Sequence, residues 1–246
     1  MTAARQTAPE LTAPVEDYLK AIYEIELGGK AAATNDIAQR LAIAPASVSG
    51  MVRRLAEQGL IAYERYRGVH LTDSGRRAAL RTLRRHRVIE AYLANALGYA
   101  WDRVHEEAER LEHAASDELV DRMAAAIGEP TVDPHGAPIP TREGAVDERR
   151  LVSLADLEAG AHARVVRVSD EDAQRLRYLA KLEVLPGTEV IVTERAPYDG
   201  PITLQLAATR SQLGPALAAQ VLVERLPAVP APRRPRGTRG KVRKRK

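Results

Sequence analysis

The chain contains no cysteine. This absence excludes disulfides, structural zinc sites with thiolate ligands and cysteine nucleophiles, so nitrogen and oxygen atoms must hold any bound metal. Runs of about 18 apolar residues, which a membrane-spanning helix requires, are also lacking. The amino-terminal segment is polar and does not resemble a signal peptide. We therefore expect a cytoplasmic protein that has no membrane partner.

Acidic residues are missing from the last fourteen positions, which hold nine lysines and arginines. The 246 residues carry a net charge of +4, so residues 1–232 carry −5 once those nine are set aside. The folded part of the chain is therefore acidic. Residues 228–246 offer almost nothing to bury, and we predict a disordered basic tail. This tail either adds nonspecific attraction to phosphates or only keeps the protein soluble.

The first third of the chain predicts a winged helix-turn-helix. An amphipathic helix starts near Pro14, with Thr12 as its cap. A short helix capped by Thr34 and a second helix that opens with Pro45 are joined by a three-residue break, which is typical of a helix-turn-helix. Residues 60–71 then predict a β-hairpin that would form the wing.

Helices and a small β domain follow. We predict a long helix over about 73–97 and one or two helices over 102–127. Residues 128–144 contain four prolines and predict an extended linker without regular structure. Beyond it we predict strands at 163–168, 189–193 and 202–206 around a helix at 170–182, which indicates a small barrel-like domain.

The second helix of a helix-turn-helix lies in the major groove of DNA. The candidate contact residues are Ala44, Ala46, Ser47, Ser49 and Gly50, with Arg53 and Arg54 beside the phosphates and Arg65 and Arg67 on the wing. The alternative is a helical domain that binds no nucleic acid, but the order helix, tight turn, helix and hairpin favours DNA. Because Gly50 and the alanines offer no specific donor, we expect indirect readout and contacts to thymine methyl groups to contribute.

Histidine and glutamate recur at helical spacing in two segments. His105, Glu109, Glu112 and His113 fall within an arc of about 100° on one helix face, and His86 and Glu90 repeat the offset of four residues. These side chains can converge on a metal. The alternative is a solvated surface with ion pairs, such as Glu106 with Arg110 or Arg103 with Glu107. Ligands of this kind suit Mn²⁺ or Fe²⁺ better than Cu⁺ or structural zinc, although ligand softness does not exclude Zn²⁺, Co²⁺ or Ni²⁺.

A metalloenzyme is disfavoured by the absence of catalytic motifs. The residue four beyond His105 is Glu109, so His-Glu-x-x-His is missing, as are Gly-x-Ser-x-Gly and a phosphate-binding loop. A di-metal oxidase in a helix bundle would need two Glu-x-x-His pairs, but Arg110 and Leu83 stand three residues before His113 and His86. We expect no enzymatic activity.

Several motifs occur in a characteristic order. They are Glu-Asp-Tyr-Leu-Lys-Ala-Ile-Tyr-Glu at 16–24, the helix-turn-helix and wing up to Leu-Thr-Asp-Ser-Gly-Arg at 71–76, Arg-Arg-His-Arg at 84–87, residues 104–113 with Ser116-Asp117, and Asp-Pro-His-Gly-Ala-Pro-Ile-Pro at 133–140. In this order they resemble the DtxR/MntR family of metal-dependent transcriptional repressors, over residues 14 to about 227.

The resemblance implies a mainly α protein with small β parts. Its domains would be a winged helix-turn-helix (1–76), a helical metal-binding and dimerisation domain with the proline-rich linker (77–145), an SH3-like or FeoA-like domain (146–227), and the tail (228–246). It further implies a homodimer that binds double-stranded operator DNA and controls metal-homeostasis genes.

The resemblance also assigns metal ligands. The primary site falls on Asp17, Glu109, Glu112 and His113, the ancillary site on His86, Glu90 and His105, and Glu171 with Gln174 match a Glu-x-x-Gln pattern through which the SH3-like domain adds ligands. Iron-responsive members carry Met and Cys at the positions of Asp17 and Glu109, so the carboxylates here imply Mn²⁺. The alternative is an Fe²⁺-dependent repressor of iron-uptake genes.

Two further expectations follow from the resemblance. Manganese-type proteins with a two-metal cluster often carry another acidic ligand, whereas the residue after Leu19 is Lys20, which favours an ancillary site of the iron type. A ligand set divided between Asp17 and the 105–113 segment would join the DNA-binding and dimerisation domains. Metal binding would then fix the spacing of two recognition helices and shift the population toward the DNA-competent form.

Overall fold

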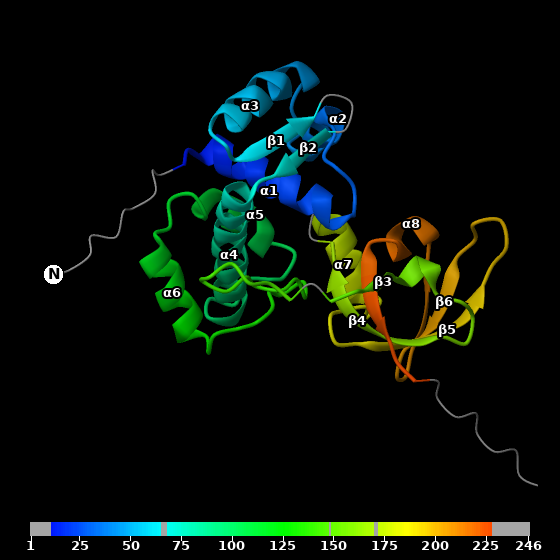
Figure 1. Cartoon of the computed structure of the whole chain (residues 1–246). Coiled ribbons are helices and arrows are strands. Elements are labelled where there is room, and N and C mark those ends of the chain that lie inside the picture. The colour runs from blue at the N-terminus through cyan, green and yellow to red at the C-terminus, as the bar shows by residue number, and fades with distance from the viewer. Residues whose placement is uncertain (1–10, 65–67, 148, 170–171, 228–246) are drawn as a thin grey trace, which may run out of the picture.

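The computed structural model of the chain describes residues 11–64, 68–147, 149–169 and 172–227. They form a helix-turn-helix unit, a helical unit and a sheet-containing unit, arranged in that order along the chain (Figure 1). Arg65, Arg67, Glu171 and the basic tail lie outside the described residues. Within the described ranges, no helix is both long and apolar enough to cross a membrane.

The first unit has the predicted order of elements. These are α1 (Ala13–Leu27), α2 (Thr34–Arg40), α3 (Pro45–Glu57), β1 (Ile61–Glu64) and β2 (Gly68–Leu71). Strands β1 and β2 pair in antiparallel register, which confirms the hairpin. Thr12 is the N-cap residue of α1, as predicted, although its side chain makes no capping bond. The predicted cap Thr34 was wrong, because Thr34 is the first residue of α2 and Ala33 takes the cap position.

Helix α4 (Asp73–Asn95) is shared by the first two units. The Thr72 hydroxyl accepts a hydrogen bond from Gly75 N at 3.1 Å, as expected of a helix cap. Leu83, near the middle of α4, packs in the core of the helix-turn-helix unit, whereas Val88 and Leu93 pack against α5 (Val104–Leu111) and α6 (Asp117–Ala126). A rigid helix therefore runs from one core into the next.

Residues 128–144 contradict the prediction of an extended linker. They contain no helix or strand, yet Asp133 and His135 are buried. The Asp133 carboxylate accepts hydrogen bonds from His135 N (2.8 Å) and Ala137 N (3.0 Å), which closes a tight loop. Arg84 and Arg87 on α4 donate to the carbonyls of Pro140 and Pro138. Contacts with a distant helix, which local composition does not encode, fix this loop.

The C-terminal unit is a six-stranded antiparallel sheet in the order β3-β8-β4-β5-β6-β7. Its elements are β3 (Val152–Ser153), a 3-10 turn (Leu154–Asp156), β4 (His162–Val168), α7 (Ala173–Lys181), β5 (Glu189–Arg195), β6 (Ile202–Gln205), β7 (Arg210–Leu213), α8 (Pro215–Ala218) and β8 (Val221–Arg225). The three predicted strands and the helix are present. Strands β3, β7 and β8 were not predicted.

The sheet-containing unit docks on the buried loop of the helical unit. Val168 N at the end of β4 donates to the His135 carbonyl at 2.9 Å. Gly136 has a φ of +86°, and a Cβ atom there would lie 1.8 Å from the Val166 carbonyl oxygen. Only glycine allows this close approach. Arg177 on α7 also pairs with Asp102 at 2.8 Å, so β4 and α7 both hold the unit in place.

Candidate metal centre

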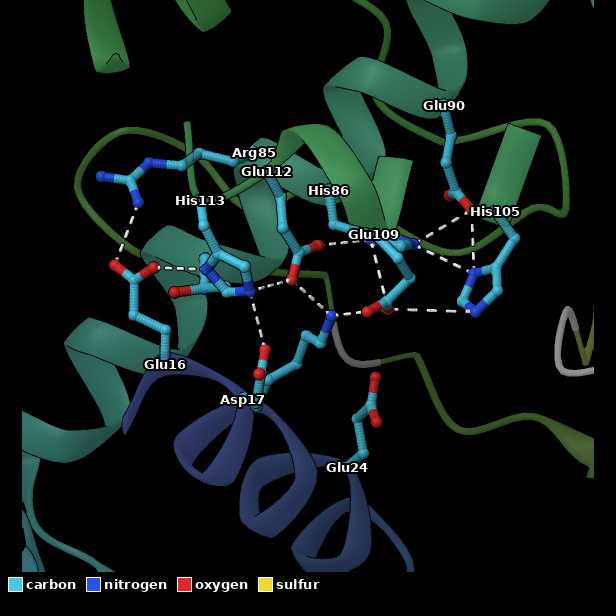
Figure 2. A network of polar contacts seen from close by, with 12 residues as sticks. Glu16, Asp17, Glu24, Arg85, His86, Glu90, His105, Glu109, Glu112 and His113 are labelled. Atoms are coloured by element: carbon cyan, nitrogen blue, oxygen red, sulfur yellow. Dashed lines mark hydrogen bonds and ion pairs between the residues drawn. The ribbon is translucent and has the colours of Figure 1, made fainter. Parts of the chain in front are cut away.

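Four segments bring histidines and carboxylates together: α1, α4, α5 with the turn after it, and the 133–139 loop. Figure 2 shows the first three meeting in a continuous network of polar contacts. The described residues include three groups whose potential ligand atoms lie within 4.8 Å of one another: Asp17/Glu112/His113, His86/His105/Glu109 and Glu90/Asp133/His135. We call them the primary, ancillary and loop clusters. Their members differ from the predicted sites: Glu109, expected in the primary site, groups with His86 and His105. Glu90, expected in the ancillary site, groups with Asp133 and His135.

The primary cluster joins α1 to the turn that follows α5. His113 Nε2 lies 2.8 Å from Asp17 Oδ1 and 3.5 Å from Glu112 Oε1. The other ring nitrogen, Nδ1, lies 2.7 Å from Glu16 Oε2, so carboxylates flank the imidazole on both sides (Figure 2). Arg85 from α4 holds Glu16 at 3.0 Å. These groups orient His113 before any ion binds.

The ancillary cluster lies between α4 and α5. His86 Nε2 is 3.1 Å from His105 Nδ1, and Glu90 Oε1 lies 3.1 Å from the first and 3.3 Å from the second (Figure 2). Glu109 Oε1 is 3.9 Å from His105 Nε2. The i, i+4 offsets predicted from the sequence therefore place His86 with Glu90 and His105 with Glu109 in one network.

The sequence had indicated that one helix carries His105, Glu109, Glu112 and His113. This prediction was wrong, because only the first two of these residues lie within α5. Helix α5 ends at Leu111, Glu112 is its C-cap, and Ala114 N and Ala115 N both donate to Leu111 O. The chain turns there because Ser116 begins the next helix as its N-cap. The turn carries His113 toward α1. Of the surface pairs proposed as the alternative, Glu106–Arg110 is present, and Arg110 also pairs with Glu107 at 3.0 Å.

Sequence reasoning missed the loop cluster. The Asp133-Pro-His135-Gly motif was noted only as part of a resemblance, and Glu90 was placed in the ancillary set alone. Glu90 and His135 are completely buried, and His135 Nδ1 lies 3.8 Å from Glu90 Oε1. His135 Nε2 donates to the Trp101 carbonyl at 2.8 Å, while Glu90 Oε2 and His135 Nδ1 have no hydrogen-bond partner among the described residues. Buried oxygen and nitrogen atoms that have a free lone pair and no hydrogen-bond partner are suited to binding a cation.

Lys20 stands between the primary and ancillary clusters. Its Nζ atom lies 2.7 Å from Glu109 Oε1 and 2.6 Å from Glu112 Oε1. Lys20 follows Asp17 by three residues, so both side chains project from the same face of α1. At the sequence level Lys20 was considered only as the residue that stands where a further acidic ligand was expected, and these ion pairs were not predicted.

Histidine pKa values are raised by these carboxylates. Burial opposes the charged form of His86, but the charge of Glu90 and hydrogen bonds to Glu112 and Glu90 outweigh it and raise the pKa to about 10. Burial likewise opposes the charged form of His113, yet its hydrogen bond to Glu16 and the charge of Asp17 raise its pKa. Burial raises the pKa of Asp17, against the opposing charges of His113 and Lys20. Protonated histidines therefore neutralise the carboxylates in the absence of an ion.

A hollow of about 270 Å³ opens beside the ancillary cluster, and His86, His105 and Glu109 are among its lining residues. Asp17 and Lys20 of α1 line the same hollow. An ion or a water molecule has room to reach the clusters by this route. The donor chemistry, the spacing and the access together fit a hard or borderline divalent cation.

The predicted ligands from the C-terminal unit are not placed at this centre. Glu171 lies outside the described residues, and Gln174 is exposed on the first turn of α7. The backbone N of Gln174 donates to Asp172 Oδ1 at 2.8 Å. Within the described ranges, no hydrogen bond links its side chain to the three clusters. Their role as ligands stays a prediction.

Helix α3 presents the residues that were predicted to face DNA. The described members of that set are all exposed: Ala44, Ala46, Ser47, Ser49, Gly50, Arg53 and Arg54. The opposite side of α3 buries Val48, Val52 and Leu55 in the core of the unit. This division into a buried and an open face is what a recognition helix requires.

Comparisons with known proteins agree with this architecture. Three family models match in chain order: "Iron dependent repressor, N-terminal DNA binding domain" over residues 10–69, "Iron dependent repressor, metal binding and dimerisation domain" over 72–141, and "FeoA domain" over 152–225. The iron-dependent repressor IdeR of Mycobacterium tuberculosis is 34% identical over 203 residues, which are 78% of this chain and 88% of the relative. The chain belongs to the iron-dependent repressor family.

Solved structures of other repressors share the fold. A manganese-dependent transcriptional repressor in complex with manganese is 39% identical, has a TM-score of 0.79 and covers 86% of this chain and 100% of its own. ScaR with bound Zn²⁺ is 30% identical, with a TM-score of 0.75 and coverage of 86% and 99%. This protein is thus a metal-dependent DNA-binding transcriptional repressor, and the relatives are repressors rather than enzymes.

In this repressor, α1 connects the metal centre with the helix-turn-helix core. Asp17 and Lys20 face α5 and the turn after it, whereas Leu19 and Ile22 belong to the same hydrophobic core as Val48 of α3. A displacement of α1 must therefore move α3, because close-packed side chains transmit displacement.

Proposed function

We propose that Mn²⁺ is the co-repressor of this protein and that the primary cluster is where it acts. The observation that carries the proposal is the pairing of Asp17 on α1 with Glu112 and His113 beyond α5. By holding one cation in common, these three side chains fix α1, and hence α3, relative to α4 and α5. A bound cation supplies the positive charge that His113 provides by protonation in its absence.

The ligand set supports Mn²⁺ over softer metals. Carboxylate oxygens and imidazole nitrogens make up all three clusters, without a thiolate or thioether. Two carboxylates, from Asp17 and Glu112, join a single imidazole in the primary cluster. Oxygen-rich sets of this kind suit a hard ion. The manganese-dependent repressor with bound manganese is also 39% identical to this chain.

Fe²⁺ is the second candidate. The curated relatives include iron-dependent repressors such as IdeR, which is 34% identical. The ancillary cluster, with two histidines and Glu109, contains more nitrogen than the primary cluster. Nitrogen-rich sites favour later members of the first-row divalent series. The regulated genes would then serve iron uptake rather than manganese homeostasis.

We further propose that the protein acts as a homodimer on double-stranded operator DNA, through the domains 1–76, 77–145 and 146–227. Two copies of α3 would enter successive major grooves, so half-sites separated by about one helical turn or a multiple of it are expected. The exposed Arg53 and Arg54 would contact phosphates, and Ser47 and Ser49 base edges or phosphates. The metal-binding residues would set the distance between the two copies of α3.

Fluorescence anisotropy with a promoter fragment tests the proposal. The full-length protein is titrated onto the DNA with Mn²⁺, with Fe²⁺ under anaerobic conditions, and with a chelator. We expect tight binding with Mn²⁺ and at least about a tenfold loss with the chelator. Asp17→Ala and His113→Ala should abolish the response to metal. The matched substitutions Asp147→Ala and His162→Ala, outside the clusters, should preserve it.

Two results would contradict the proposal. Asp17→Ala and His113→Ala variants that bind DNA and respond to Mn²⁺ like the unmodified chain would show that the primary cluster is not the regulatory site. A response to Fe²⁺ but not to Mn²⁺ at matched free concentrations would show that the second candidate is correct.

A further inference from the structure

A polar hollow lies on helix α4, apart from the three clusters. Its volume is about 600 Å³, and it opens between α4, α6 and the turn at 141–144. Most of the residues that line it are charged: Arg77, Arg81, Arg84, Arg85, Arg142, Asp117, Asp121 and Glu143. Five positive and three negative charges leave this lining with a net charge of +2.

Helix α4 brings four of these arginines to one face. Residues 77, 81, 84 and 85 fall within an arc of about 100° around the helix axis. Helix α6 lies beside α4 (Figure 1). Asp117, its first residue, lines the hollow, so the positive end of the α6 dipole lies at the same place. The side chains and the helix end both favour an anion there.

Each of the two α6 carboxylates is shared by two arginines. Asp121 Oδ1 lies 3.1 Å from a nitrogen of Arg84 and 2.8 Å from one of Arg142. Asp117 is shared in the same way by two arginines of α4. One carboxylate neutralises one guanidinium, so each such pair of arginines keeps a positive charge. A guanidinium cannot lose its proton to relieve the repulsion.

Partial burial makes this excess of positive charge costly. The side chains of Arg84 and Arg85 are only 14% and 10% exposed. Like charges repel more strongly in a partly buried site than in water, because the effective dielectric constant is lower. One arginine for each carboxylate would be enough to hold α6 on α4, so ion pairing within the fold does not account for all of them. An anion bound in the hollow would supply the missing negative charge.

Arg85 also connects the hollow with the primary cluster. Its guanidinium bonds to one oxygen of Glu16 at 3.0 Å, and the other oxygen lies 2.7 Å from His113 Nδ1 (Figure 2). An anion in the hollow competes for the donors of Arg85 and leaves more of the Glu16 charge facing His113. Greater negative charge beside the primary cluster favours a divalent cation there. The anion and the metal should therefore strengthen each other's binding.

We propose that this hollow, which we call the arginine site, binds a small phosphate-bearing molecule and couples it to the metal centre through Arg85. Guanidinium groups match phosphate oxygens in two-point contacts, and a phosphate monoester carries a charge of about −1.5 to −2 at pH 7, which complements the lining. The volume leaves room for a group larger than phosphate itself, such as a sugar. The coupling rests on the proposed function of the primary cluster, whereas the binding of the anion does not.

Isothermal titration calorimetry on the full-length, metal-free protein tests the binding. The probes are inorganic phosphate and ribose 5-phosphate, with succinate as the carboxylate comparison, all at one ionic strength. We expect one phosphate-bearing molecule to bind per chain and succinate to bind more weakly. The tighter of the two phosphates shows whether the ligand is phosphate itself or a phosphate ester, and either result supports the site.

Matched arginine variants separate the site from general surface charge. Arg81→Gln and Arg142→Gln should each weaken phosphate binding by about tenfold or more, because each removes charged hydrogen bonds to the ligand. Arg122→Gln makes the same change at an exposed arginine of α6 that does not line the hollow, and it should leave binding unchanged. Circular dichroism checks that each variant keeps its fold.

Reciprocity gives a second readout. The dissociation constant of ribose 5-phosphate is measured with and without saturating Mn²⁺, and that of Mn²⁺ with and without ribose 5-phosphate. Free Mn²⁺ is corrected for its complex with the sugar phosphate in solution. Because one coupling free energy governs both ligands, both constants should fall by the same factor, at least about fivefold.

Different results overturn different parts of the inference. A folded protein that binds neither phosphate would overturn the arginine site. Equal binding of succinate and the phosphates, or equal losses in Arg81→Gln and Arg122→Gln, would overturn it as well, by showing only a nonspecific attraction of anions. Dissociation constants that do not respond to the other ligand would remove the link through Arg85. A chain that binds ribose 5-phosphate but no Mn²⁺ would overturn the proposed function and leave the anion site standing.

Discussion

Metal binding should release protons from the histidines of this centre, because both His86 and His113 have a carboxylate at each ring nitrogen. His113 lies between Glu16 and Asp17, and His86 between Glu112 and Glu90. An imidazole donates from both nitrogens only when it is protonated. A histidine that ligates a metal must be neutral, because the metal takes the lone pair of one ring nitrogen. We expect about one proton to be released for each of these histidines that binds an ion, or about two per chain.

The pKa values give the direction and size of the pH dependence. At pH 7 the solution lies below the His86 pKa of about 10, so a proton competes with an ion for this imidazole. The His113 pKa is raised as well. Because both histidines are protonated below these raised values, metal affinity must rise with pH, by up to about tenfold per unit for each proton released.

Isothermal titration calorimetry measures this release directly. Mn²⁺ is titrated at pH 7 in buffers of different ionisation enthalpy, and the dependence of the observed enthalpy on the buffer gives the number of protons. His113→Gln should lower that number by about one, whereas Asp147→Ala should not change it. An observed enthalpy that is the same in every buffer, in a protein that binds Mn²⁺, would refute the assignment of protonated histidines to the metal-free state.

Two further outcomes concern other parts of the molecule. Gly136→Ala should lower the free energy of unfolding, measured in urea, by at least about 2 kcal/mol, because its Cβ would meet the Val166 carbonyl oxygen at 1.8 Å. The control Gly98→Ala, at a φ of +70° with nothing within 4 Å of the added Cβ, should lower it by only about 1 kcal/mol. Equal losses for the two variants would disprove the contact at Gly136. Arg54→Ala on α3 should reduce the slope of log K against log salt for DNA binding by about 1, whereas the exposed Arg122→Ala on α6 should leave it unchanged. An unchanged slope for Arg54→Ala would remove α3 from the phosphate backbone.

Local sequence patterns predicted the elements whose stability is local. The tight break before Pro45, the hairpin of residues 60–71 and the long helix after Thr72 all follow from turn chemistry, capping and periodicity. The offset of four residues found His86 with Glu90 and His105 with Glu109. Joining Asp17 to Glu112 and His113 required the family resemblance, because spacing along one helix says nothing about a second helix.

Features that depend on distant residues were missed. Lys20 meets Glu109 and Glu112 across 89 and 92 positions of the chain, and no local pattern encodes such a pair. Strand β7, with the sequence Arg-Ser-Gln-Leu, is short and largely polar, and it exists because it pairs with β6. The proline-rich loop was predicted to be an extended linker. Its ordered structure depends on arginines of α4 that donate to its carbonyls, and its own sequence does not reveal those contacts.

Glu90 belongs to the surroundings of two clusters at once. One of its oxygens faces His86 and His105 and lies 3.8 Å from His135, while the other has no hydrogen-bond partner in the part of the chain that the structure describes. A carboxylate has a single unit of charge to distribute, so whatever binds on one side of Glu90 alters the free energy of binding on the other. By thermodynamic reciprocity the two equilibria must influence each other equally. If both the ancillary and the loop clusters bind ions, their saturation curves have to be fitted jointly, and a dissociation constant for either would have meaning only with the occupancy of the other stated.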